Sequence, residues 1–532
     1  MRRRTAVEET GARRICHEIG SPIPGLSMKT QPYWSDTARP LKFPSLKGDL
    51  KVDVVVIGGG ITGATAAHLL KKAGATVALL ERDRCGGAET GHTTAHLTYV
   101  TDTRLHKLVQ QFGRDHAQAA WDGGRAAIKC IAQIVEDEGI ACEFAWVPGY
   151  LHAPLGQRTK EEEIEAMRED ARLARELGFD GRFTEKVPLM EKVGVCFSDQ
   201  AKFHPIKYLT ALLRTIPGGG CHVFENSEVS QIEAEPLKLK ANGYTISCRY
   251  VFVATHVPLQ GATGTVSAAL FQTKLAPYTS YAVGAKIPSG VVGEASFWDT
   301  ADPYFYLRID RRKGYAYAIL GGADHKTGQV RDPEKHYARV EQRMRRLFPQ
   351  AAIDHRWSGQ VIETSDGLPF MGETAPGQFV ATGFSGNGMT YGTLGAMMAC
   401  DSFLKKANPW SQLFNVDRKP FLAGAWDYLK ENKDYPYYML KQMLTKPKAT
   451  ALRNIKRGEG QVVLLDGEKV AAFRDEKGKL TTKSAICPHM GCVVRWNGAE
   501  KTWDCPCHGS RFQSTGEVMA GPAETDLADA GA

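Results

Sequence analysis

One stretch, residues 51–81, constrains the fold of this chain more than any other. Its first part, Val52–Ile57, is a near-continuous apolar run that predicts a parallel strand buried on both faces. A G-x-G-x-x-G motif follows at Gly58–Gly63, and the residues behind it predict a helix that Gly74 ends. A second apolar run, Val77–Leu80, predicts the next strand. This order of strand, glycine turn, helix and strand is typical of a unit that binds a dinucleotide.

Each glycine of the motif has a separate physical role. Gly58 permits the tight turn, Gly60 lets a pyrophosphate approach the backbone, and Gly63 lets the helix pack closely on the strand. The helix N-terminus supplies N–H groups for the phosphates, because its first amides have no partner within the helix. Glu81, which closes the second strand, is placed to bind ribose hydroxyls. We expect the dinucleotide to contact Gly58, Gly60, Ile61, Thr62, Gly63, Glu81 and Arg82.

Length and composition exclude several classes of protein. At 532 residues the chain exceeds one ordinary domain, and its 43% hydrophobic and 24% charged residues are typical of a soluble globular protein. The net charge of +8 comes without a basic stripe interleaved with aromatic residues, so we expect no nucleic-acid partner. No run approaches the roughly 18 apolar residues of a transmembrane segment. Residues 1–27 lack the apolar core of a signal peptide, and we expect them to have no role in the fold.

The twelve cysteines divide into two groups. Eight are scattered singly along the chain, which is typical of a reducing cytosol, and we therefore expect a cytoplasmic protein. The other four lie between Cys487 and Cys507, and this density indicates a site.

The middle of the chain predicts a second sheet. Phe144–Pro154 reads as a pair of strands that turn at Pro148-Gly149. Three later segments alternate or run apolar, as expected for antiparallel strands. They are Tyr278–Ile287, Tyr304–Ile309 and Tyr315–Leu320.

A second glycine-rich turn lies between a strand, Gln378–Thr382, and a helix of small residues that ends at Phe403. Its sequence, Gly383–Thr390, places N–H groups where they can face an anion or an electron-rich ring edge. It lacks the G-x-G-x-x-G spacing, so we predict a single dinucleotide site in this chain.

These motifs together resemble the FAD-dependent D-amino-acid oxidase/glycine oxidase/sarcosine dehydrogenase superfamily. Besides the glycine motif, the resemblance rests on Thr94-Ala95, on Phe203–Pro205, and on the closing motif that runs from Asp366–Pro369 to Gly388. It implies FAD as the cofactor, with the second glycine turn near the pyrimidine edge of the flavin. The FAD contacts that it implies beyond the first motif are Thr93, Thr94, Ala95, Gly383, Gly386, Gly388, Met389 and Thr390.

The cysteine-rich segment contains two pairs of ligand residues. Cys487-x-His489 and Cys505-x-x-His508 are separated by 15 residues, and each pair offers one thiolate and one imidazole. This set fits a 2Fe-2S cluster in which two cysteines bind one iron and two histidines bind the other. A structural zinc site is the alternative, although the spacing differs from that of a zinc finger. Two further cysteines, Cys492 and Cys507, lie where they could bridge the two loops.

The same segment resembles the Rieske proteins of the cytochrome bc type, whose C-x-H-x-G-C and C-P-C-H-G-S boxes it matches. The resemblance implies that Cys492 and Cys507 form a disulfide and that Ser510 donates a hydrogen bond to a cluster sulfide. It also implies that Gly521–Ala523 is a loop covering the cluster. High-potential members carry a tyrosine where this chain has Phe512.

The fold class that we predict is α/β, a Rossmann-like FAD domain with an inserted antiparallel-sheet substrate domain, followed by an all-β Rieske domain. The predicted boundaries place an N-terminal extension first and a partly helical connector, around 426–444, before the last domain. In order, the parts are 1–50 (extension), 51–409 (FAD-dependent oxidoreductase, with the substrate domain at about 141–200 and 260–350), 410–454 (connector) and 455–532 (Rieske domain).

The resemblance implies an FAD-dependent dehydrogenase or oxidase acting on an amine or amino acid, with electrons passing through the cluster to an external acceptor. Arg308 is the candidate for orienting a substrate carboxylate, because a planar guanidinium binds a carboxylate through two hydrogen bonds. An electron-transfer or redox-sensing protein without small-molecule turnover is the alternative. A Rieske oxygenase is disfavoured, because no pair of histidines with a downstream acid lies outside the flavin loop. Candidate walls of the substrate site are Tyr278, Tyr281 and Tyr306, with Tyr150 and His256 as weaker candidates.

Overall fold

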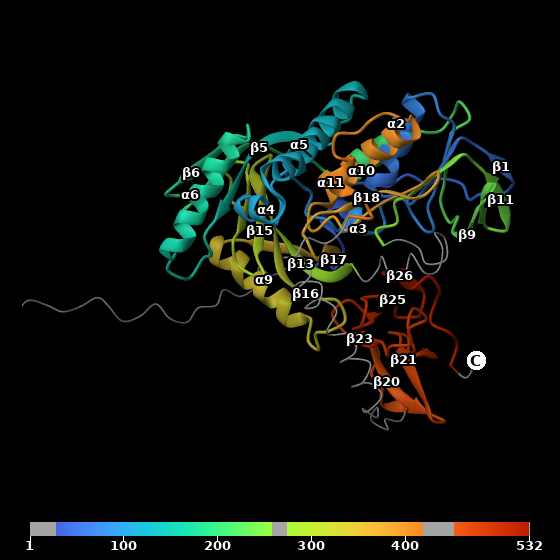
Figure 1. The fold of residues 1–532 in the computed structure, drawn as a ribbon. Coiled ribbons are helices and arrows are strands. Elements are labelled where there is room, and N and C mark those ends of the chain that lie inside the picture. Colours follow the sequence, from blue (N-terminus) through green and yellow to red (C-terminus); the bar gives the residue numbers. More distant parts are fainter. Residues whose placement is uncertain (1–27, 258–273, 419–451, 531–532) are drawn as a thin grey trace, which may run out of the picture.

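The computed structural model describes residues 28–257, 274–418 and 452–530. Figure 1 shows a large body with helices and strands, formed by the first two ranges, and a smaller body of strands below it, formed by the third. We call residues 452–530 the C-terminal domain. Within the described ranges, no helix combines the length and the apolar character needed to cross a lipid bilayer.

A six-stranded sheet contains the predicted dinucleotide-binding unit. Its order is β18-β19-β12-β2-β3-β8, and all neighbouring strands are parallel except β18 and β19. Its strands are β2 (Val54–Ile57), β3 (Val77–Leu80), β8 (His222–Phe224), β12 (Tyr250–Val253), β18 (Phe370–Ala375) and β19 (Gln378–Thr382).

Both faces of this sheet are covered, which explains the continuous apolar run of β2. On one face, Val54 and Val56 belong to the core that includes α2 (Ile61–Lys72) and α10 (Gly388–Phe403), which lie against each other in Figure 1. On the other face, Val55 and Ile57 pack on a four-stranded sheet. The strands of that sheet are β1 (Leu50–Lys51), β9 (Val229–Ala234), β10 (Leu237–Ala241) and β11 (Tyr244–Ser247).

A second sheet has nine strands in the order β17-β13-β16-β15-β14-β5-β7-β4, with β6 paired to β7. Helix α9 (Glu334–Leu347) packs on β13 and β16, and α6 (Glu161–Glu176) packs on β6 and β7. Its strands are β4 (His96–Leu97), β5 (Ala145–His152), β6 (Gly181–Thr184), β7 (Gly194–Lys202), β13 (Leu275–Ile287), β14 (Ser296–Asp299), β15 (Phe305–Arg312), β16 (Tyr315–Lys326) and β17 (Ala352–Thr364). The other helices of the large body are α1 (Tyr33–Thr37), α3 (Glu89–His92), α4 (Leu105–Phe112), α5 (Arg114–Asp137), α7 (Pro205–Arg214) and α11 (Ser411–Phe414).

One predicted turn in this sheet is wrong. The segment around Pro148 is the single strand β5, and residues on both sides of the proline pair with β7. The register shifts between Val147 and Gly149, so a bulge accommodates the residue that cannot donate a ladder hydrogen bond.

Part of the predicted N-terminal extension is packed into the large body. Trp34, in α1, is fully buried and its indole nitrogen donates to the carbonyl oxygen of Thr93 at 2.6 Å. The neighbouring Tyr33 stacks on Tyr317 of β16 with ring centroids 4.1 Å apart. The fold of the large body therefore includes residues 28–50, whereas residues 1–27 lie outside the described part of the chain.

The C-terminal domain is all-β apart from one turn of helix, η1 (Leu452–Asn454), which agrees with the predicted fold class. A three-stranded sheet and a four-stranded sheet enclose a core around Trp503 and Phe512. The strands are β20 (Glu459–Leu465), β21 (Glu468–Arg474), β22 (Leu480–Ser484), β23 (Arg495–Asn497), β24 (Thr502–Asp504), β25 (Arg511–Gln513) and β26 (Val518–Ala520). The helix predicted around 426–444 lies outside the described residues.

Candidate functional site

The glycine turn between β2 and α2 has no space for side chains at two of its positions. Gly58 has a φ of +111°, and a Cβ atom there would lie 2.5 Å from the carbonyl oxygen of Ala254. A Cβ atom on Gly63 would lie 2.0 Å from the carbonyl oxygen of Gly58. Because the turn and the first residues of α2 line a cavity, the backbone at this helix N-terminus is accessible to a phosphate group. These features fit a bound dinucleotide.

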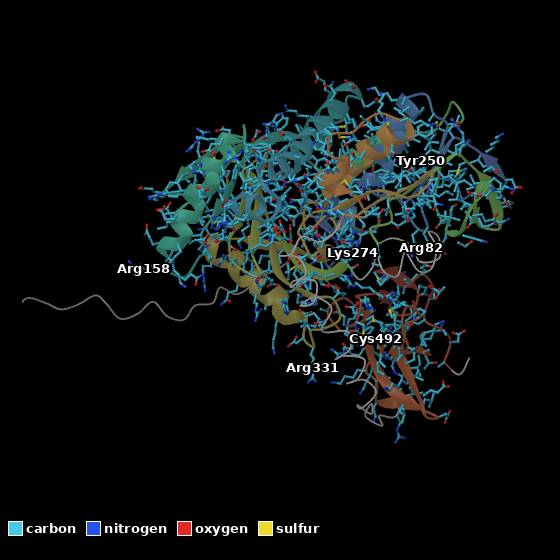
Figure 2. The ribbon with its side chains drawn as sticks, viewed as in Figure 1. Arg82, Arg158, Tyr250, Lys274, Arg331 and Cys492 are labelled. Atoms are coloured by element: carbon cyan, nitrogen blue, oxygen red, sulfur yellow. A yellow bond between two sulfur atoms is a disulfide. The ribbon has the colours of Figure 1, made fainter. Side chains whose placement is uncertain are left out.

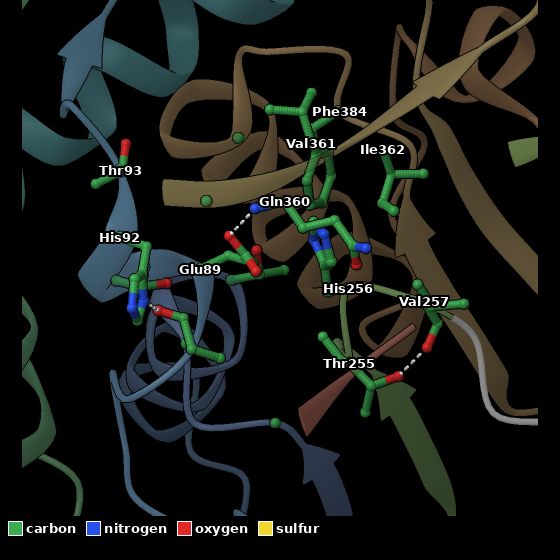
Figure 3. A pocket seen from close by; sticks show the side chains of 18 of the residues that line it. Glu89, His92, Thr93, Thr255, His256, Val257, Gln360, Val361, Ile362 and Phe384 are labelled. Atoms are coloured by element: carbon green, nitrogen blue, oxygen red, sulfur yellow. Dashed lines mark hydrogen bonds between the residues drawn. The ribbon is translucent and has the colours of Figure 1, made fainter. Parts of the chain in front are cut away.

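The cavity has a volume of about 520 Å³ and runs from this turn to the second glycine turn. Figure 3 shows part of it, where Glu89, Gln360 and Phe384 approach from three segments of the chain. Most of the residues predicted to bind FAD line it; Gly63, Ala95, Gly383 and Thr390 pack behind the lining. Those on the wall are Gly58, Gly60, Ile61, Thr62, Glu81, Arg82, Thr93, Thr94, Gly386, Gly388 and Met389.

Glu81 lies at the end of β3, as the motif predicts, and is held by backbone amides. Its carboxylate accepts hydrogen bonds from the amides of Gly59 at 2.7 Å and Asp83 at 2.9 Å. Burial raises the pKa of this carboxyl group, while the two amides act in the opposite direction. Glu81 therefore holds the glycine turn in place through the Gly59 amide. Its contact with a ribose stays a prediction.

The second glycine turn also lines the cavity, and it begins α10 at Gly388. Two hydrogen bonds tie it to neighbouring segments: the Ser385 amide donates to the Ile362 carbonyl at 3.0 Å, and the Asn387 side chain donates to the Val100 carbonyl at 3.3 Å. The turn thus connects the dinucleotide-binding sheet to the second sheet.

Arg308, the predicted ligand of a substrate carboxylate, does not line the cavity. Its guanidinium is fully buried and binds Asp310 (Nε to Oδ1, 2.8 Å) and the carbonyl oxygen of Ala95 (2.8 Å). Burial alone would raise the pKa of Asp310, but Arg308 and Lys202 outweigh it and lower that pKa. A guanidinium that is enclosed and paired in this way cannot reach a substrate, so the prediction for Arg308 is wrong.

Several cavity residues were not found from the sequence. Of the predicted walls, Tyr306 and His256 line the cavity, whereas Tyr150, Tyr278 and Tyr281 do not. The unpredicted polar lining residues come from separate segments and carry no local motif. They include Glu89, Asp102, Ser280, Tyr304, Asp324 and Gln360.

The C-terminal domain brings the four predicted metal ligands together. Cys487 and Cys505 are almost fully buried, and a hydrogen bond between their thiols lowers the pKa of Cys487 to about 7 while raising that of Cys505. The rings of His489 and His508 lie 4.8 Å apart and nearly perpendicular. Burial lowers the pKa of both histidines to about 4, so each presents the neutral imidazole that binds metals.

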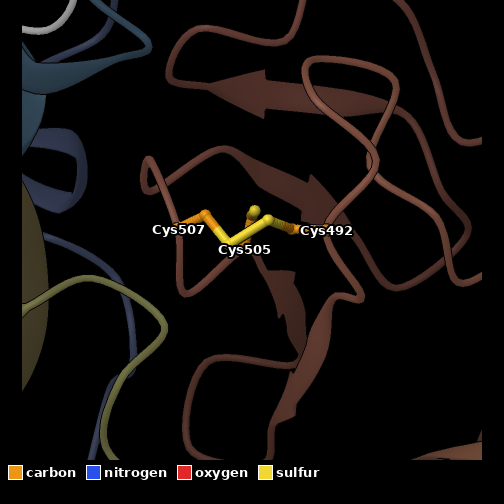
Figure 4. A group of neighbouring side chains, drawn as sticks. All are labelled: Cys492, Cys505 and Cys507. Carbon is orange, nitrogen blue, oxygen red and sulfur yellow. A yellow bond between two sulfur atoms is a disulfide. The ribbon is translucent and has the colours of Figure 1, made fainter. Parts of the chain in front are cut away.

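Cys492 and Cys507 form the predicted disulfide, with an S–S distance of 2.05 Å. Figure 4 shows this bond beside the sulfur of Cys505, and the three sulfur atoms lie within 4.8 Å of one another. The disulfide joins the two ligand loops and leaves two thiols and two imidazoles, a donor set that fits a 2Fe-2S cluster.

Ser510 and Phe512 lie close behind this ligand set. The Ser510 hydroxyl accepts a hydrogen bond from the Ala523 amide at 3.1 Å and donates one to the Cys487 sulfur. Phe512 is fully buried in the same core as Cys487 and Cys505. Ser510 therefore polarises one predicted ligand, Cys487, and the Phe512 side chain has no polar group to offer it.

The loop that carries Cys505 and His508 packs directly on the cavity wall of the large body. The Gln360 side chain lines the cavity and donates to the carbonyl oxygen of Gly509 at 2.9 Å, while Gln329 donates to the Pro506 carbonyl at 3.2 Å. A Cβ atom on Gly509 would lie 2.3 Å from the ring of Pro277, so this approach requires glycine.

A second contact between the two bodies lies at the dinucleotide end of the cavity. Arg82 donates to the carbonyl oxygen of Met519 at 3.1 Å, and residues 519–525 of the C-terminal domain line the cavity. Figure 2 labels Arg82 where the large body meets this domain. The C-terminal domain thus forms part of the cavity wall.

Comparisons with known proteins identify both bodies. The sequence model of the FAD dependent oxidoreductase family matches residues 53–402, and that of the Rieske [2Fe-2S] domain matches residues 446–530. Over 498 residues the chain is 32% identical to the Rieske 2Fe-2S iron-sulfur protein YhfW of Bacillus subtilis (strain 168), covering 92% of this chain and 96% of that protein.

More distant similarity extends over the large body. The chain is 23% identical over 415 residues to gamma-glutamylputrescine oxidoreductase of Escherichia coli (strain K12), covering 74% of this chain and 94% of that one. Its fold is similar to the crystal structure of glycine oxidase from Geobacillus kaustophilus, with a TM-score of 0.59 and 19% identity. That match covers 70% of this chain and 99% of the other.

Proposed function

The chain belongs to the FAD dependent oxidoreductase family and carries a Rieske [2Fe-2S] domain, and from this we propose that it oxidises an amine or amino-acid-like substrate and passes the electrons through the cluster to an external acceptor. FAD and the Rieske cluster are its cofactors. When bound, FAD would accept an electron pair from the substrate and the cluster would carry single electrons onward.

The proposal rests on one observation: the wall of the FAD cavity is in contact with the loop that carries Cys505 and His508. Gln360 lines the cavity and donates a hydrogen bond to Gly509, which follows the predicted cluster ligand His508. One side chain therefore contacts both the space for FAD and the loop that binds the cluster. A domain that bound its cluster for an unrelated purpose would not need this contact.

The chain's own residues position the reactants. The amides at the start of α2 would bind the phosphates of FAD, and the start of α10 lines the same cavity. Glu81 fixes the first of these turns through the Gly59 amide. The second sheet covers the far part of the cavity with polar and aromatic side chains, which supports turnover of a small molecule rather than electron transfer alone.

The choice of an amine or amino acid is supported by the names of related proteins. The Escherichia coli relative is a gamma-glutamylputrescine oxidoreductase, and the structural neighbour is a glycine oxidase. The location that we propose is the cytoplasm, because the seven described cysteines outside the C-terminal domain are all unpaired.

An anaerobic assay tests this function. The holoenzyme is mixed with a panel of amines and amino acids and with ferricyanide as a one-electron acceptor. We expect at least one substrate to bleach the flavin and to reduce ferricyanide. A panel that leaves the flavin oxidised throughout would contradict the proposal.

Replacing Gln360 tests whether its contact with Gly509 speeds electron transfer from the flavin to the cluster. Gln360→Leu removes the hydrogen bond to Gly509 without adding charge, and losing a bond of about 1 kcal/mol should slow reduction of the cluster about fivefold. Rapid-freeze electron paramagnetic resonance after mixing with substrate measures that rate, and absorbance measures flavin reduction, which should stay unchanged.

Gln329→Leu is the matched control, because Gln329 bonds the same loop at Pro506 but does not line the cavity. We expect it to leave the rate of cluster reduction close to that of the unaltered protein. Equal slowing in both variants would indicate a general weakening of docking and would count against a specific role for Gln360.

The reduction potential of the cluster should respond to hydrogen-bond donors close to its predicted ligands. Ser510→Ala removes a donor to the Cys487 sulfur, and losing about 1.5–3 kcal/mol should lower the midpoint by about 65–130 mV. Phe512→Tyr adds a hydroxyl in the same core and should raise the midpoint by tens of millivolts.

A redox titration followed by electron paramagnetic resonance separates the cluster from the flavin. Phe473→Tyr is the control, since Phe473 lies in the same core but its ring packs on Trp496. An unchanged midpoint in Phe512→Tyr, with Ser510→Ala still shifted, would show that residue 512 does not face the cluster.

A further inference from the structure

The far part of the cavity carries a group of acidic and hydroxyl side chains. Ser280, Tyr306 and Asp324 come from β13, β15 and β16, which are neighbours in the second sheet, and all three line the cavity. Asp102 and Tyr304 line it from the adjoining loops. We call these five residues the acidic end of the cavity.

The acidic end lies beside the second glycine turn. A Cβ atom on Gly386 would lie 2.6 Å from the Asp102 carboxylate, so this acid directly contacts the turn expected near the flavin ring. The Tyr304 hydroxyl donates a hydrogen bond to Asp102 Oδ2 at 2.9 Å. The acidic end therefore adjoins the place where a substrate would meet FAD.

One carboxylate oxygen of this group is available for a ligand. The Ser280 hydroxyl bonds that of Tyr306 at 2.6 Å, and it opposes the rise that burial causes in the pKa of the nearby Asp324 carboxyl group. No donor among the residues that the structure describes reaches Asp324 Oδ1, although this atom is buried. A buried carboxylate oxygen without a partner is costly, and a cationic ligand would remove that cost.

The carboxyl groups of the acidic end can carry only negative charge. Burial raises the pKa of Asp102 to about 7, and the charge of Asp324 adds to this shift. Burial likewise raises the pKa of Asp324 to about 6. Arg82 and Arg84 are the only lysine or arginine residues in the described cavity lining, and both belong to its dinucleotide end.

Aromatic rings complete the site. The ring of Tyr306 lies over Gly321 of β16, where a Cβ atom would come within 2.3 Å of it, so the glycine provides space for the ring. Trp298 of β14 also lines the cavity, and its ring occupies the equivalent space above Gly149. Aromatic faces attract ammonium groups that approach within about 6 Å.

From this arrangement we propose that the acidic end binds an ammonium group, and that the substrate is an aliphatic amine that carries positive charge and no carboxylate, such as a linear diamine. The inference rests on the proposed function and narrows its substrate class. An amino acid would bring its carboxylate towards Asp102 and Asp324 without an arginine or lysine to hold it.

Binding of two matched ions to the holoenzyme tests the charge preference. Butyltrimethylammonium has a permanent positive charge and cannot form an imine, and valerate is an anion with the same alkyl chain. In isothermal titration calorimetry we expect the cation to bind and valerate to give no heat. Tighter binding of valerate than of the cation overturns the inference.

Variants assign the binding to the acidic end. Asp324→Asn should weaken binding of the cation about ten- to hundredfold, because a hydrogen bond to a charged group is lost. Asp302→Asn, which removes a nearby charge outside the cavity, should leave binding unchanged. If Asp324→Asn does not fold, Asp102→Asn tests the same prediction. Equal weakening by the Asp302 variant and the cavity variant overturns the assignment.

Turnover separates this inference from the proposed function. We expect 1,4-diaminobutane to be oxidised with a higher kcat/KM than 4-aminobutyrate, which has a carboxylate in place of one aminomethyl group. Asp324→Asn should raise KM for the diamine and leave kcat nearly unchanged. If 4-aminobutyrate is the better substrate, the inference fails and the proposed function stands. If the cation binds but no amine or amino acid is oxidised, the proposed function fails.

Discussion

Gly63→Val will give a protein that keeps its iron and loses its flavin. A Cβ atom at this position would lie 2.0 Å from the Gly58 carbonyl oxygen and 3.1 Å from Val56, so α2 cannot stay packed on β2. The backbone amides that we expect to bind the phosphates of FAD would then move away from the cavity. Flavin absorbance and iron content per protein measure the two losses separately, and we expect the flavin-to-protein ratio to fall to background.

Gly48→Val is the matched control, because nothing lies within 4 Å of a Cβ atom on Gly48. We expect this variant to keep both cofactors. A Gly63→Val protein with normal flavin content would contradict the assignment of the turn. Loss of iron together with flavin would instead indicate that the whole chain had misfolded, which circular dichroism would reveal.

Cys505→Ser will give the opposite result, a yellow protein without the cluster. Cys505 is buried in the C-terminal domain, and an alcohol in its place is a far weaker iron ligand than a thiolate. Flavin should be retained, because the cavity wall formed by α2 and α10 is unaltered. Iron and acid-labile sulfide analysis measures the loss, and turnover with the one-electron acceptor should fall while substrate still reduces the flavin.

Cys196→Ser is the control for this variant. It makes the same chemical change at an unpaired cysteine of β7, far from the ligand loops in sequence, and should leave iron and turnover unchanged. Stoichiometric iron in Cys505→Ser would refute its role as a ligand. Full turnover without iron would show that electrons leave the flavin by another route.

Local motifs were sufficient to predict the two cofactor sites. Gly58 and Gly63 are required by close backbone contacts within one strand–turn–helix unit, so their spacing carries the information. The same holds for Cys487 and His489, which lie two residues apart on one loop. The disulfide was available only from the resemblance, and the structure confirms it.

Arg308 shows where a local prediction failed although the sequence contained the answer. In a strand, residues two apart point to the same face, so Arg308 and Asp310 of β15 were bound to be neighbours. An arginine that is paired with Asp310 is not available to bind a substrate carboxylate. The fully buried ion pair instead connects β15 to the loop at Ala95.

The acidic end could not be predicted from the sequence. Ser280, Tyr306 and Asp324 lie on separate strands and meet only because the second sheet orders these strands as β13, β16 and β15, and Asp102 joins them from a loop. The contact of Gln360 with Gly509 likewise forms only because a loop of the C-terminal domain packs on the large body. Contacts of this kind depend on topology, which single-sequence periodicity does not determine.

The place of residues 519–525 in the cavity wall has a consequence for how the protein matures. The large body precedes the C-terminal domain in the chain and is synthesised first, so it can fold and take up FAD while its cavity still lacks this part of the wall. Docking of the C-terminal domain then adds residues 519–525 to the cavity wall and narrows the exit for FAD. We therefore expect a flavin that is lost after docking to return only as fast as the two bodies separate.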